Sequence, residues 1–545
     1  ILLHNATNSM NEFFDLGFIV PNSGSKTTTS DKLRTYFGHV TKGNSEVYDT
    51  PFAKGEETQA LLDAWNEILV SISDEWPSLY EFEIDLRSKV GPLSVMKPLK
   101  KRITDVEEYY KGIHLPGVPI EPWAVWDVIH EWQRAKGLRF RSESRTIERM
   151  KMSTNSGSPY FSKRRLVRSL TGYDIGVDTY GLRVAIHQRA WEGLATAVLG
   201  WRGQEGGPSP EDVKQRVVWM FPYAVNVLEL GVYQPLIEAA QTLQLVPAWV
   251  SMESVDKRIT QLFDTKAEGD LIVCTDFTKF DQHFNEYLQD AAYEILQSLL
   301  TPNQDSKLWL REVFPIKYRI PMMTNFGTLY TGEHGMASGS GGTNADETLA
   351  HRALQYEAAG LRNATLNPNS MCLGDDGILS YPGITSEDVT DSYSSHGLEM
   401  NKGKQYESDK DCIYLRRWHH KDYRKDGVCV GVYSTFRALG RLRYLERYYD
   451  PEVWSSKAVA LRQLSIIENC KYHPLKEQFA QFCMKRDKYR LGIDIPDFLD
   501  NIKREAIEVI DMMPDFLGYT KTLQAGSDPS KGIDEWWIVK YLRSM

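Results

Sequence analysis

Short apolar runs along this chain stop beside acidic residues at two widely separated places. A β-branched run, Leu-Ile-Val, is typical of a buried strand, and it delivers Asp276 near its end. Two further apolar runs, 371–373 and 378–379, enclose the sequence Gly-Asp-Asp-Gly. Because glycine tolerates turn geometry and apolar runs favour burial, the pattern predicts a β-hairpin with Asp375 and Asp376 at its tip.

Helical periodicity predicts most of the other elements. The expected helices cover 61–76, 123–134, 233–243, 251–263, 286–300, 345–359 and 386–396, and the pattern is again helical from 435 onward. Segment 412–420 alternates apolar and polar residues and is expected to pair with 427–433 as a hairpin. With 545 residues the chain exceeds one ordinary domain, so we expect several sub-structures around a shared core.

A Gly/Ser-rich loop, 335–344, lies between the two acidic places in the sequence. Such a loop exposes backbone N–H groups and hydroxyls, which suit a sugar-phosphate chain. A strand ending in Asp276 beside a hairpin tipped by Asp375 would favour divalent cations, since a cation offsets two neighbouring carboxylates. Two-metal nucleotidyl transfer needs such a clamp. Taken alone, Gly-Asp-Asp favours an ordinary solvated turn, so the prediction depends on the combination.

Three motifs in a fixed order are the basis of a resemblance to a known family. They are Asp276-x4-Asp281, Ser338-Gly339-x3-Thr343 and Gly374-Asp375-Asp376. Together they resemble the palm of viral RNA-dependent RNA polymerases. The amino-acid sequences of the first two motifs are most similar to those in polymerases of small double-stranded RNA viruses, the picobirnavirus and partitivirus group. The resemblance covers residues 153–433 well and both ends poorly.

This resemblance implies an α+β, right-hand polymerase fold of fingers, palm and thumb with a closed, encircled active site. The expected parts are an N-terminal arm (1–60), fingers (61–226), palm (227–312), a fingers insertion (313–331), palm again (332–433), thumb (434–522) and a C-terminal tail (523–545). The implied activity is RNA-templated RNA synthesis, which transcribes and replicates a viral double-stranded RNA genome by two-metal nucleotidyl transfer, without a primer.

The resemblance also implies a role for each matching residue. Asp276 and Asp375 would bind two Mg²⁺ or Mn²⁺ ions, with Asp376 assisting from the outer shell. Asp281 would accept a hydrogen bond from the ribose 2′-OH, which distinguishes RNA from DNA precursors. The remaining residues expected to shape the nucleotide pocket are Ser338, Gly339, Thr343 and Asn344.

One position departs from the family pattern. Many relatives have Asn four residues after the motif threonine, and this chain has Glu347 there. Asn344 lies nearby but would face a different direction on a helix. The residues that read the sugar are therefore less firmly predicted than those that bind the metal.

Basic and small residues elsewhere match further motifs. Lys214 and Arg216 precede an apolar strand, as in the motif whose Arg covers the nucleotide base and whose Lys holds its phosphates; the alternative is one exposed basic pair. Downstream of Asp376, Lys404 is favoured over Lys402 as the general acid for the leaving pyrophosphate, with an exposed turn lysine as the alternative. The last motif resembles a template-entry loop or, equally, a plain surface turn, and consists of Ser156, Gly157, Ser158 and Pro159.

Composition adds limits on partners. The net charge of −9 argues against a protein that coats nucleic acid, but it permits an internal basic channel. The implied partners are an RNA template, its product duplex, nucleoside triphosphates and a viral capsid protein. No run of eighteen apolar residues occurs, so we expect no membrane partner, and the implied location is the virion interior or host cytoplasm. Six cysteines without Cys-x-x-Cys pairing indicate reduced, mostly buried thiols.

The sequence leaves two questions open, the role of the aromatic tail and the choice between the activity and its rivals. The aromatic tail ending in Trp536, Trp537 and Tyr541 either packs as a helix on the thumb or folds back to the catalytic cleft and supports initiation by stacking. The activity itself has two rivals. A reverse transcriptase would have aromatic residues where Asp281 and Gly374 stand, and a catalytically silent RNA-binding or capsid-associated protein would not need the intact acidic and basic motifs.

Overall fold

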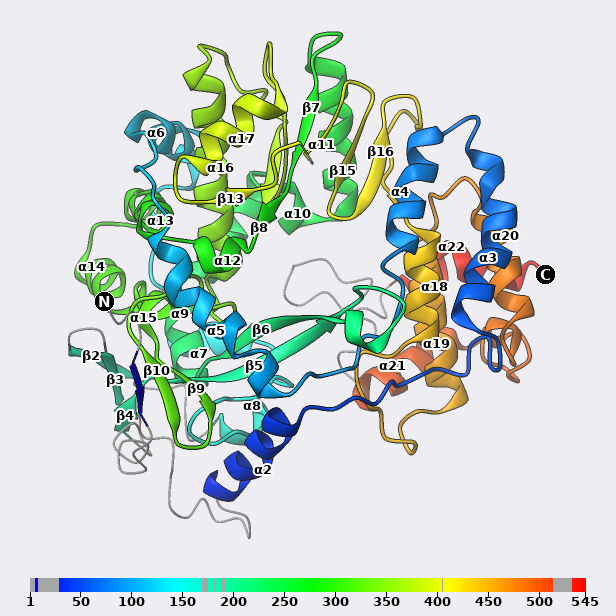
Figure 1. Cartoon of the computed structure of the whole chain (residues 1–545), viewed down its shortest axis with the longest axis horizontal. Coiled ribbons are helices and arrows are strands. Elements are labelled where there is room, and N and C mark those ends of the chain that lie inside the picture. Colours follow the sequence, from blue (N-terminus) through cyan, green and yellow to red (C-terminus); the bar gives the residue numbers. More distant parts are fainter. Residues whose placement is uncertain are drawn as a thin grey trace. The chain divides into compact units, whose positions relative to one another are not determined.

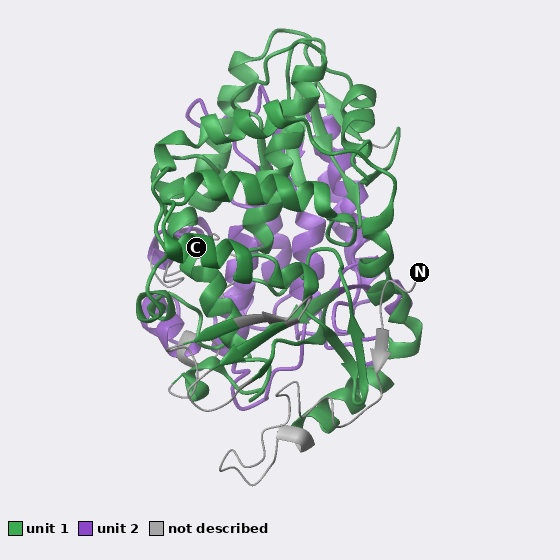
Figure 2. Cartoon of the chain, turned by 90° about the vertical axis from the view of Figure 1, so that its left-hand side faces the viewer, with its two compact units in different colours: residues 1–43, 97–202, 217–412 green, residues 44–96, 203–216, 413–545 purple. Residues whose placement is uncertain are grey.

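The computed structural model describes residues 5–7, 29–168, 175–180, 183–187, 192–403, 405–512 and 532–545 (Figure 1). The chain forms two compact units, which are distinguished by colour in Figure 2. Unit 1 comprises 1–43, 97–202 and 217–412, and unit 2 comprises 44–96, 203–216 and 413–545. Each unit has its own core of buried hydrophobic side chains.

The helices of unit 1 are α2 (Thr29–Lys42), α5 (Ile103–Lys111), α6 (Pro122–Glu131), α7 (Glu143–Glu148), α8 (Arg164–Val167), α9 (Tyr223–Thr242), α10 (Pro247–Val250), α11 (Met252–Thr265), α12 (Phe280–His283), α13 (Glu286–Leu299), α14 (Gln304–Leu308), α15 (Ile316–Arg319), α16 (Thr343–Leu361) and α17 (Ser386–Ser394). Those of unit 2 are α3 (Thr58–Leu69), α4 (Pro77–Arg87), α18 (Thr435–Arg443), α19 (Ser456–Glu468), α20 (Lys476–Lys485), α21 (Ile502–Met512) and α22 (Trp537–Arg543).

Within the described ranges the strands are short and form five sheets. They are β1 (Asn5–Thr7), β2 (Gly176–Tyr180), β3 (Arg183–His187), β4 (Glu192–Leu194), β5 (Ala197–Gln204), β6 (Lys214–Met220), β7 (Ile272–Thr275), β8 (Phe277–Thr278), β9 (Met322–Asn325), β10 (Thr328–Thr331), β11 (Met371–Leu373), β12 (Asp376–Leu379), β13 (Glu399–Met400), β14 (Tyr406–Ser408), β15 (Asp411–Tyr414), β16 (Arg417–His420) and β17 (Val432–Tyr433).

The predicted strand and hairpin meet in one antiparallel sheet of order β11-β12-β7-β14. All four residues of β7 are buried, as its apolar sequence predicts. A second sheet, of order β1-β10-β9-β5-β6, joins β9 and β10 to β5, with β5 and β9 parallel. The segment around 313–331 therefore leaves the first sheet and contributes to another one.

The predicted helices are found with shifted ends. Helix α9 begins at Tyr223, ten residues before the predicted start at 233, and contains Pro235 in its interior. The segment 61–76 ends its α-helix at Leu69, because a 3₁₀ turn follows before α4 starts at Pro77. All six cysteines are buried and form no disulfide, as expected.

The sequence predicts segment 412–420 as one alternating strand, and the structure differs. It is divided into β15 and β16, and only β16 pairs with β17. The division falls at Leu415 and Arg416, whose φ angles are 54° and 59°. Two consecutive residues in the left-handed region reverse the chain, so the alternation continues across a turn.

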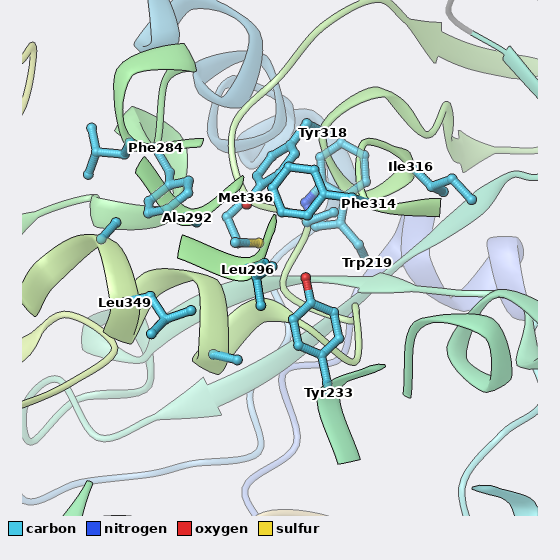
Figure 3. Close-up of a cluster of buried hydrophobic side chains, with 14 of the residues drawn as sticks. Trp219, Tyr233, Phe284, Ala292, Leu296, Phe314, Ile316, Tyr318, Met336 and Leu349 are labelled. Atoms are coloured by element: carbon cyan, nitrogen blue, oxygen red, sulfur yellow. The ribbon is translucent and has the colours of Figure 1, made fainter. Parts of the chain in front are cut away.

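A buried ion pair lies inside the core of unit 1, under the Gly/Ser-rich loop. Lys317 Nζ is 3.0 Å from Asp346 on α16, and both side chains are fully buried. Tyr233 and Tyr318 donate their hydroxyls to the same carboxylate at 2.7 and 2.6 Å. Figure 3 shows these two tyrosines among the hydrophobic side chains, with Phe314 beside Tyr318. The surrounding donors compensate the buried carboxylate and hold α16 in place.

Candidate active site

Strand register brings the two acidic places together. In the antiparallel pair β7–β12, Thr275 lies opposite Gly377 and Cys274 opposite Ile378. The next residue along β7, Asp276, therefore stands across from Asp376, at the turn that contains Asp375. Opposite Cα atoms in such a pair are about 4.5–5.5 Å apart. The side chains of Asp276 and Asp375 are exposed, whereas that of Asp376 is half-buried.

The turn before Asp375 is supported by helix α16. Gly374 has a φ of +57°, which L side chains rarely adopt. Its N–H donates to Thr348 Oγ1 at 2.9 Å, and its carbonyl lies 2.8 Å from His351 Nδ1. Burial lowers the pKa of His351 to about 4, so the ring is neutral and Nδ1–H donates to the carbonyl. These bonds fix the direction in which Asp375 points.

The backbone of Asp276 is held by a side chain from the next part of the sheet. Gln405 Oε1 accepts from Asp276 N at 2.6 Å, and Gln405 Nε2 donates to Asp276 O at 3.0 Å. The same amide also donates to Asn401 O at 3.2 Å. Gln405 is buried at 7% exposure. One side chain therefore fixes the peptide groups on both sides of the Asp276 Cα.

The Gly/Ser-rich loop is closed onto strand β6 and onto itself. Ser338 Oγ donates to Val217 O at 3.0 Å. A Cβ on Gly339 would lie 1.5 Å from Trp219 O, so only glycine permits this approach. Thr343 Oγ1 contacts the carbonyls of Ala337 and Ser340, both at 3.2 Å. The hydroxyl groups of Ser338 and Thr343 thus serve the loop conformation.

A buried carboxylate on α9 fixes the tip of that loop. Glu229 is fully buried and accepts from Ser340 Oγ and, at 3.1 Å, from Gly341 N. Asn226 donates to Glu229 at 3.2 Å and to the Gly339 carbonyl at 3.3 Å. Burial raises the pKa of Glu229, while Lys317 opposes the shift. The loop is therefore bound to α9 at three consecutive residues.

Asp281 lies on α12, one turn from the end of β7 in the sequence, and its carboxyl group is hydrogen-bonded to Glu347 on α16. Glu347 is 5% exposed. Burial, then the neighbouring Asp281 and Asp375, raises its pKa well above the usual range. Glu347, the residue that differs from the family pattern, is therefore in direct contact with Asp281, the residue expected to bind the ribose.

Comparisons with known proteins identify the family of this chain. The model of the family "Viral RNA-dependent RNA polymerase" matches residues 132–472. A protein named "Potential RNA-dependent RNA polymerase", from Human picobirnavirus (strain Human/Thailand/Hy005102/-), is 60% identical over 97% of this chain and 98% of its own length.

The chain belongs to the viral RNA-dependent RNA polymerases. Comparison with solved structures supports the same family assignment. The crystal structure of the RNA-dependent RNA polymerase of a human picobirnavirus matches with a TM-score of 0.92 at 58% identity, covering 99% of both chains. The crystal structure of an insertion-loop deletion mutant of the RNA-dependent RNA polymerase of a human picobirnavirus matches with a TM-score of 0.90 at 56% identity, again covering 99% of both chains. The polymerase fold expected from the resemblance is confirmed, and none of the helices described for this polymerase is long and apolar enough to cross a membrane.

The basic residues expected to bind nucleotide lie in unit 2 of the polymerase. Lys214 and Arg216 are exposed at the start of β6. Arg216 lies close enough to Arg416 to be among the charges that lower the pKa of Arg416, after burial and Arg437. The carboxylate of Glu205 pairs with Arg416 and Arg437 of this group.

Glu205 pairs with three guanidinium groups of unit 2. Its oxygens lie 3.0 Å from Arg437 Nε, 3.2 Å from Arg441 NH2 and 3.7 Å from Arg416 NH1. Burial acts to raise the pKa of Glu205, but these arginines outweigh it and lower the pKa. The link joins the hairpin between β5 and β6 to helix α18 and leaves an excess of positive charge.

The predicted template-entry loop is buried in the polymerase, which corrects the plain surface turn weighed as its alternative. Residues 156–159 are all buried. Ser156 O accepts from Tyr223 N at 2.8 Å, and a Cβ on Gly157 would lie 2.3 Å from Phe221 O. Contact between these four residues and a template stays a prediction, which their burial does not favour. The exposed neighbours are Thr154 and Asn155.

Three other predicted site residues have mixed outcomes. Asn344 accepts from Trp249 Nε1 at 2.8 Å and supports the helix start, so its role toward nucleotide stays a prediction. Lys402 is 73% exposed and 3.3 Å from Asp391. Lys404 lies outside the described residues.

The tail helix α22 packs on unit 2, where Trp537 N and Ile538 N both donate to Glu468 at 3.0 Å, as the thumb-packed alternative predicts.

The sequence predictions included Thr343 and noted Glu347 only as a departure from the family pattern, and they missed His351, Gln405, Glu229 and Glu205. Thr343, Glu347 and His351 follow one another at four-residue intervals on α16 and therefore share a face. A polar stripe on a buried helix could have indicated a site. Gln405, Glu229 and Glu205 have no comparable signal, because their partners are distant in the chain.

Proposed function

We propose that this polymerase copies a viral double-stranded RNA genome, in transcription and replication, by two-metal nucleotidyl transfer. The observation that supports the proposal most is the register that stands Asp276 beside the turn of Asp375, with both carboxylates exposed. Adjacent carboxylates repel each other unless a cation lies between them.

We assign Asp276 and Asp375 as ligands of two Mg²⁺ or Mn²⁺ ions, with Asp376 in the outer shell. In the described residues no group of three or more His, Cys, Asp or Glu is arranged to hold a metal ion. This suits Mg²⁺, which proteins usually hold with one or two carboxylates while water and substrate phosphates complete the site. When bound, such ions would acidify the 3′-OH and stabilise the leaving pyrophosphate.

The chain's own residues then select and orient the nucleotide. Asp281 accepts the ribose 2′-OH, and the loop closed by Ser338, Gly339 and Thr343 borders the same pocket. Arg216 covers the base and Lys214 holds the phosphates, since a guanidinium stacks and an ammonium acts as a point charge. We retain Lys404 as the proton donor to pyrophosphate.

We propose the fingers, palm and thumb at the boundaries expected from the sequence, and an encircled active site. Within unit 2, the hairpin between β5 and β6 is joined to α18 through Glu205 and Arg437, a contact between a segment expected in the fingers and a helix expected in the thumb.

Initiation without a primer is part of the proposal. The test is incorporation of a γ-labelled nucleoside triphosphate on an unprimed template, since only the initiating nucleotide keeps its γ-phosphate. A primed template should yield elongation alone. The further partners proposed are the RNA product duplex and a viral capsid protein, and the proposed place of action is the virion interior or host cytoplasm.

The deciding experiment compares nucleotide incorporation by the wild type, Asp276→Asn and Asp375→Ala, with the exposed Asp74→Ala as the control. Both site variants should lose activity by several orders of magnitude, and the control should not. Equal incorporation by all four proteins would remove the proposed mechanism, and incorporation by none of them would return the silent RNA-binding alternative. Wild type should prefer NTP to dNTP, and Asp281→Ala should reduce that ratio; a preference for dNTP would support a reverse transcriptase.

A further inference from the structure

Helix α2 packs on the five-stranded sheet of unit 1 (Figure 1). The Tyr36 hydroxyl donates to Leu199 O on β5 at 2.5 Å. Where the helix meets the loop after α7 and the end of β6, the structure has a cavity of about 440 Å³. Its lining includes Tyr36 of the helix, Asn155 and Phe161 of the loop, and Met220 of β6. A cavity of this size falls in the range of small-molecule sites, roughly 300–1,000 Å³.

The cavity lies apart from the candidate active site. Successive residues of a strand point to opposite faces of the sheet. On β6, Trp219 is fully buried and its ring is stacked on that of His334, with 4.2 Å between ring centres, whereas the next residue, Met220, lines the cavity. The lining residues include neither Asp276 nor Asp375, and none of them belongs to the Gly/Ser-rich loop.

The charged residues that line the cavity are basic. Lys32 and His39 of α2 are among the lining residues, and no Asp or Glu lines the cavity in the described part of the chain. Lys32 Nζ donates to Ser162 Oγ at 3.4 Å, which keeps the ammonium group next to the loop. Lys163 follows in the sequence and is exposed, and its backbone pairs with that of Asn155. Positive charge without a lining carboxylate favours an anionic ligand.

A buried guanidinium group adds to this positive charge. Arg102 is 3% exposed, and its Cζ lies 3.2 Å from the ring centre of Trp201. None of its guanidinium nitrogens has a hydrogen-bond partner among the described residues. Burial lowers the pKa of Arg102 to about 9, with Asp105 and Tyr36 opposing the shift, so the group stays protonated at neutral pH. A buried cation close to Tyr36 attracts an anion bound beside that ring.

The remaining lining groups suit a nucleobase. Tyr36 and Phe161 bring two aromatic rings to the cavity. Phe161 is held by its N–H, which donates to Gly157 O at 2.8 Å. Asn155 Oδ1 accepts from Gly157 N at 2.7 Å, so the NH₂ group of the same amide is the part that can donate to a ligand. Aromatic rings stack on bases, and polar side chains hydrogen-bond the base edges.

We propose that this cavity is a second nucleotide-binding site, in which Tyr36 and Phe161 contact the base and Lys32 binds its phosphate. A nucleotide combines a flat base, polar base edges and an anion, and the lining offers a partner for each of the three. A free nucleotide and one unit of a single-stranded RNA both present this chemistry, and the experiment below distinguishes them. The inference goes beyond the proposed function and does not depend on the assignment of the metal ligands.

The test is photocrosslinking of the full chain with two probes. One is 4-thiouridine 5′-monophosphate, and the other is a short single-stranded RNA that contains one 4-thiouridine. Both are used with EDTA, because removing divalent cations suppresses binding at the catalytic acids. Mass spectrometry then locates the crosslinked residues, which should fall within 32–39 or 155–161.

Three variants show whether the cavity itself is responsible. Lys32→Ala should lower the crosslinking yield at these residues about tenfold, because it removes the charged partner of the phosphate. Thr35→Trp keeps Lys32 but fills part of the cavity, since Thr35 also lines it, and should lower the yield as well. Lys42→Ala is the matched control, because Lys42 is exposed at the end of the same helix and does not line the cavity. It should crosslink like the wild type.

The two probes separate the two sources of nucleotide. Crosslinking by the monophosphate supports a site for free nucleotides, and crosslinking by the RNA alone supports a contact with a strand. The proposal is overturned if neither probe reaches 32–39 or 155–161, or if Lys32→Ala and Lys42→Ala crosslink equally. The measurement needs no catalysis. A wild type that incorporates no nucleotide would therefore refute the proposed function and leave this result standing.

Discussion

The side-chain amide of Gln405 binds the backbone of Asp276 twice, accepting from its N–H at 2.6 Å and donating to its carbonyl at 3.0 Å. The two residues are far apart in the sequence and meet because β14 pairs with β7. The contact fixes where the first acid leaves its strand.

Replacing Gln405 with Ala should reduce kcat by about tenfold while leaving the KM for NTP nearly unchanged, because the amide positions an acid without contacting the nucleotide. The loss of three hydrogen bonds should also cost about 1–3 kcal/mol of stability. Steady-state kinetics and urea unfolding measure the two effects. Gln405→Glu, which accepts but does not donate, should fall between the wild type and Ala; an Ala variant with normal kcat would contradict the role.

Gly339 and Gly38 form a matched pair of glycine substitutions. Gly339→Ala places a Cβ 1.5 Å from Trp219 O, so the loop must move away from β6, with loss of activity and lowered stability. Gly38→Ala, in helix α2 with nothing within 4 Å, should be neutral or stabilise by about 0.5–1 kcal/mol. Thermal unfolding and nucleotide incorporation check both. Equal behaviour of the two variants would show that the close approach at Gly339 is unimportant.

Removing Glu205 should expose the repulsion among the arginines that it joins. Glu205→Ala leaves Arg416, Arg437 and Arg441 without their shared carboxylate and should cost on the order of 2–4 kcal/mol in unit 2. The midpoint of urea unfolding is the measurement. Glu452→Ala, which removes an exposed carboxylate of the same unit, should cost almost no stability. A similar loss of stability in both variants would show that Glu205 contributes no more than an ordinary exposed carboxylate.

His396 should make the stability of unit 1 depend on pH. Burial opposes its charge, but the hydrogen bond to Glu357 outweighs burial and raises the pKa of His396 above 6.5. A raised folded-state pKa gives stability that is complete below the unfolded value and is lost as pH rises through the folded value. Urea unfolding across pH 6.5 and upward should show this decline in wild type and not in His396→Gln.

The exposed His114→Gln is the control for that series and should keep the wild-type decline. An unfolding curve for His396→Gln that falls with pH as steeply as the wild type would assign the effect to other groups.

The sequence by itself determined the elements and the chemistry of the catalytic acids. The apolar run before Asp276 and the glycine-flanked Asp375 are local signals, because a strand and a hairpin are specified by neighbouring residues. The order of the motifs was enough to indicate the family, which the comparisons confirm.

Only the tertiary structure decided which residues hold those acids. The contacts Gln405–Asp276, Glu229–Ser340 and Glu347–Asp281 join residues that the sequence separates widely. The burial of 156–159 is equally invisible in the sequence, since small polar residues look the same in a surface turn and in a packed one. Such pairings depend on strand register and helix packing, which arise when the whole core is assembled and not from any local pattern.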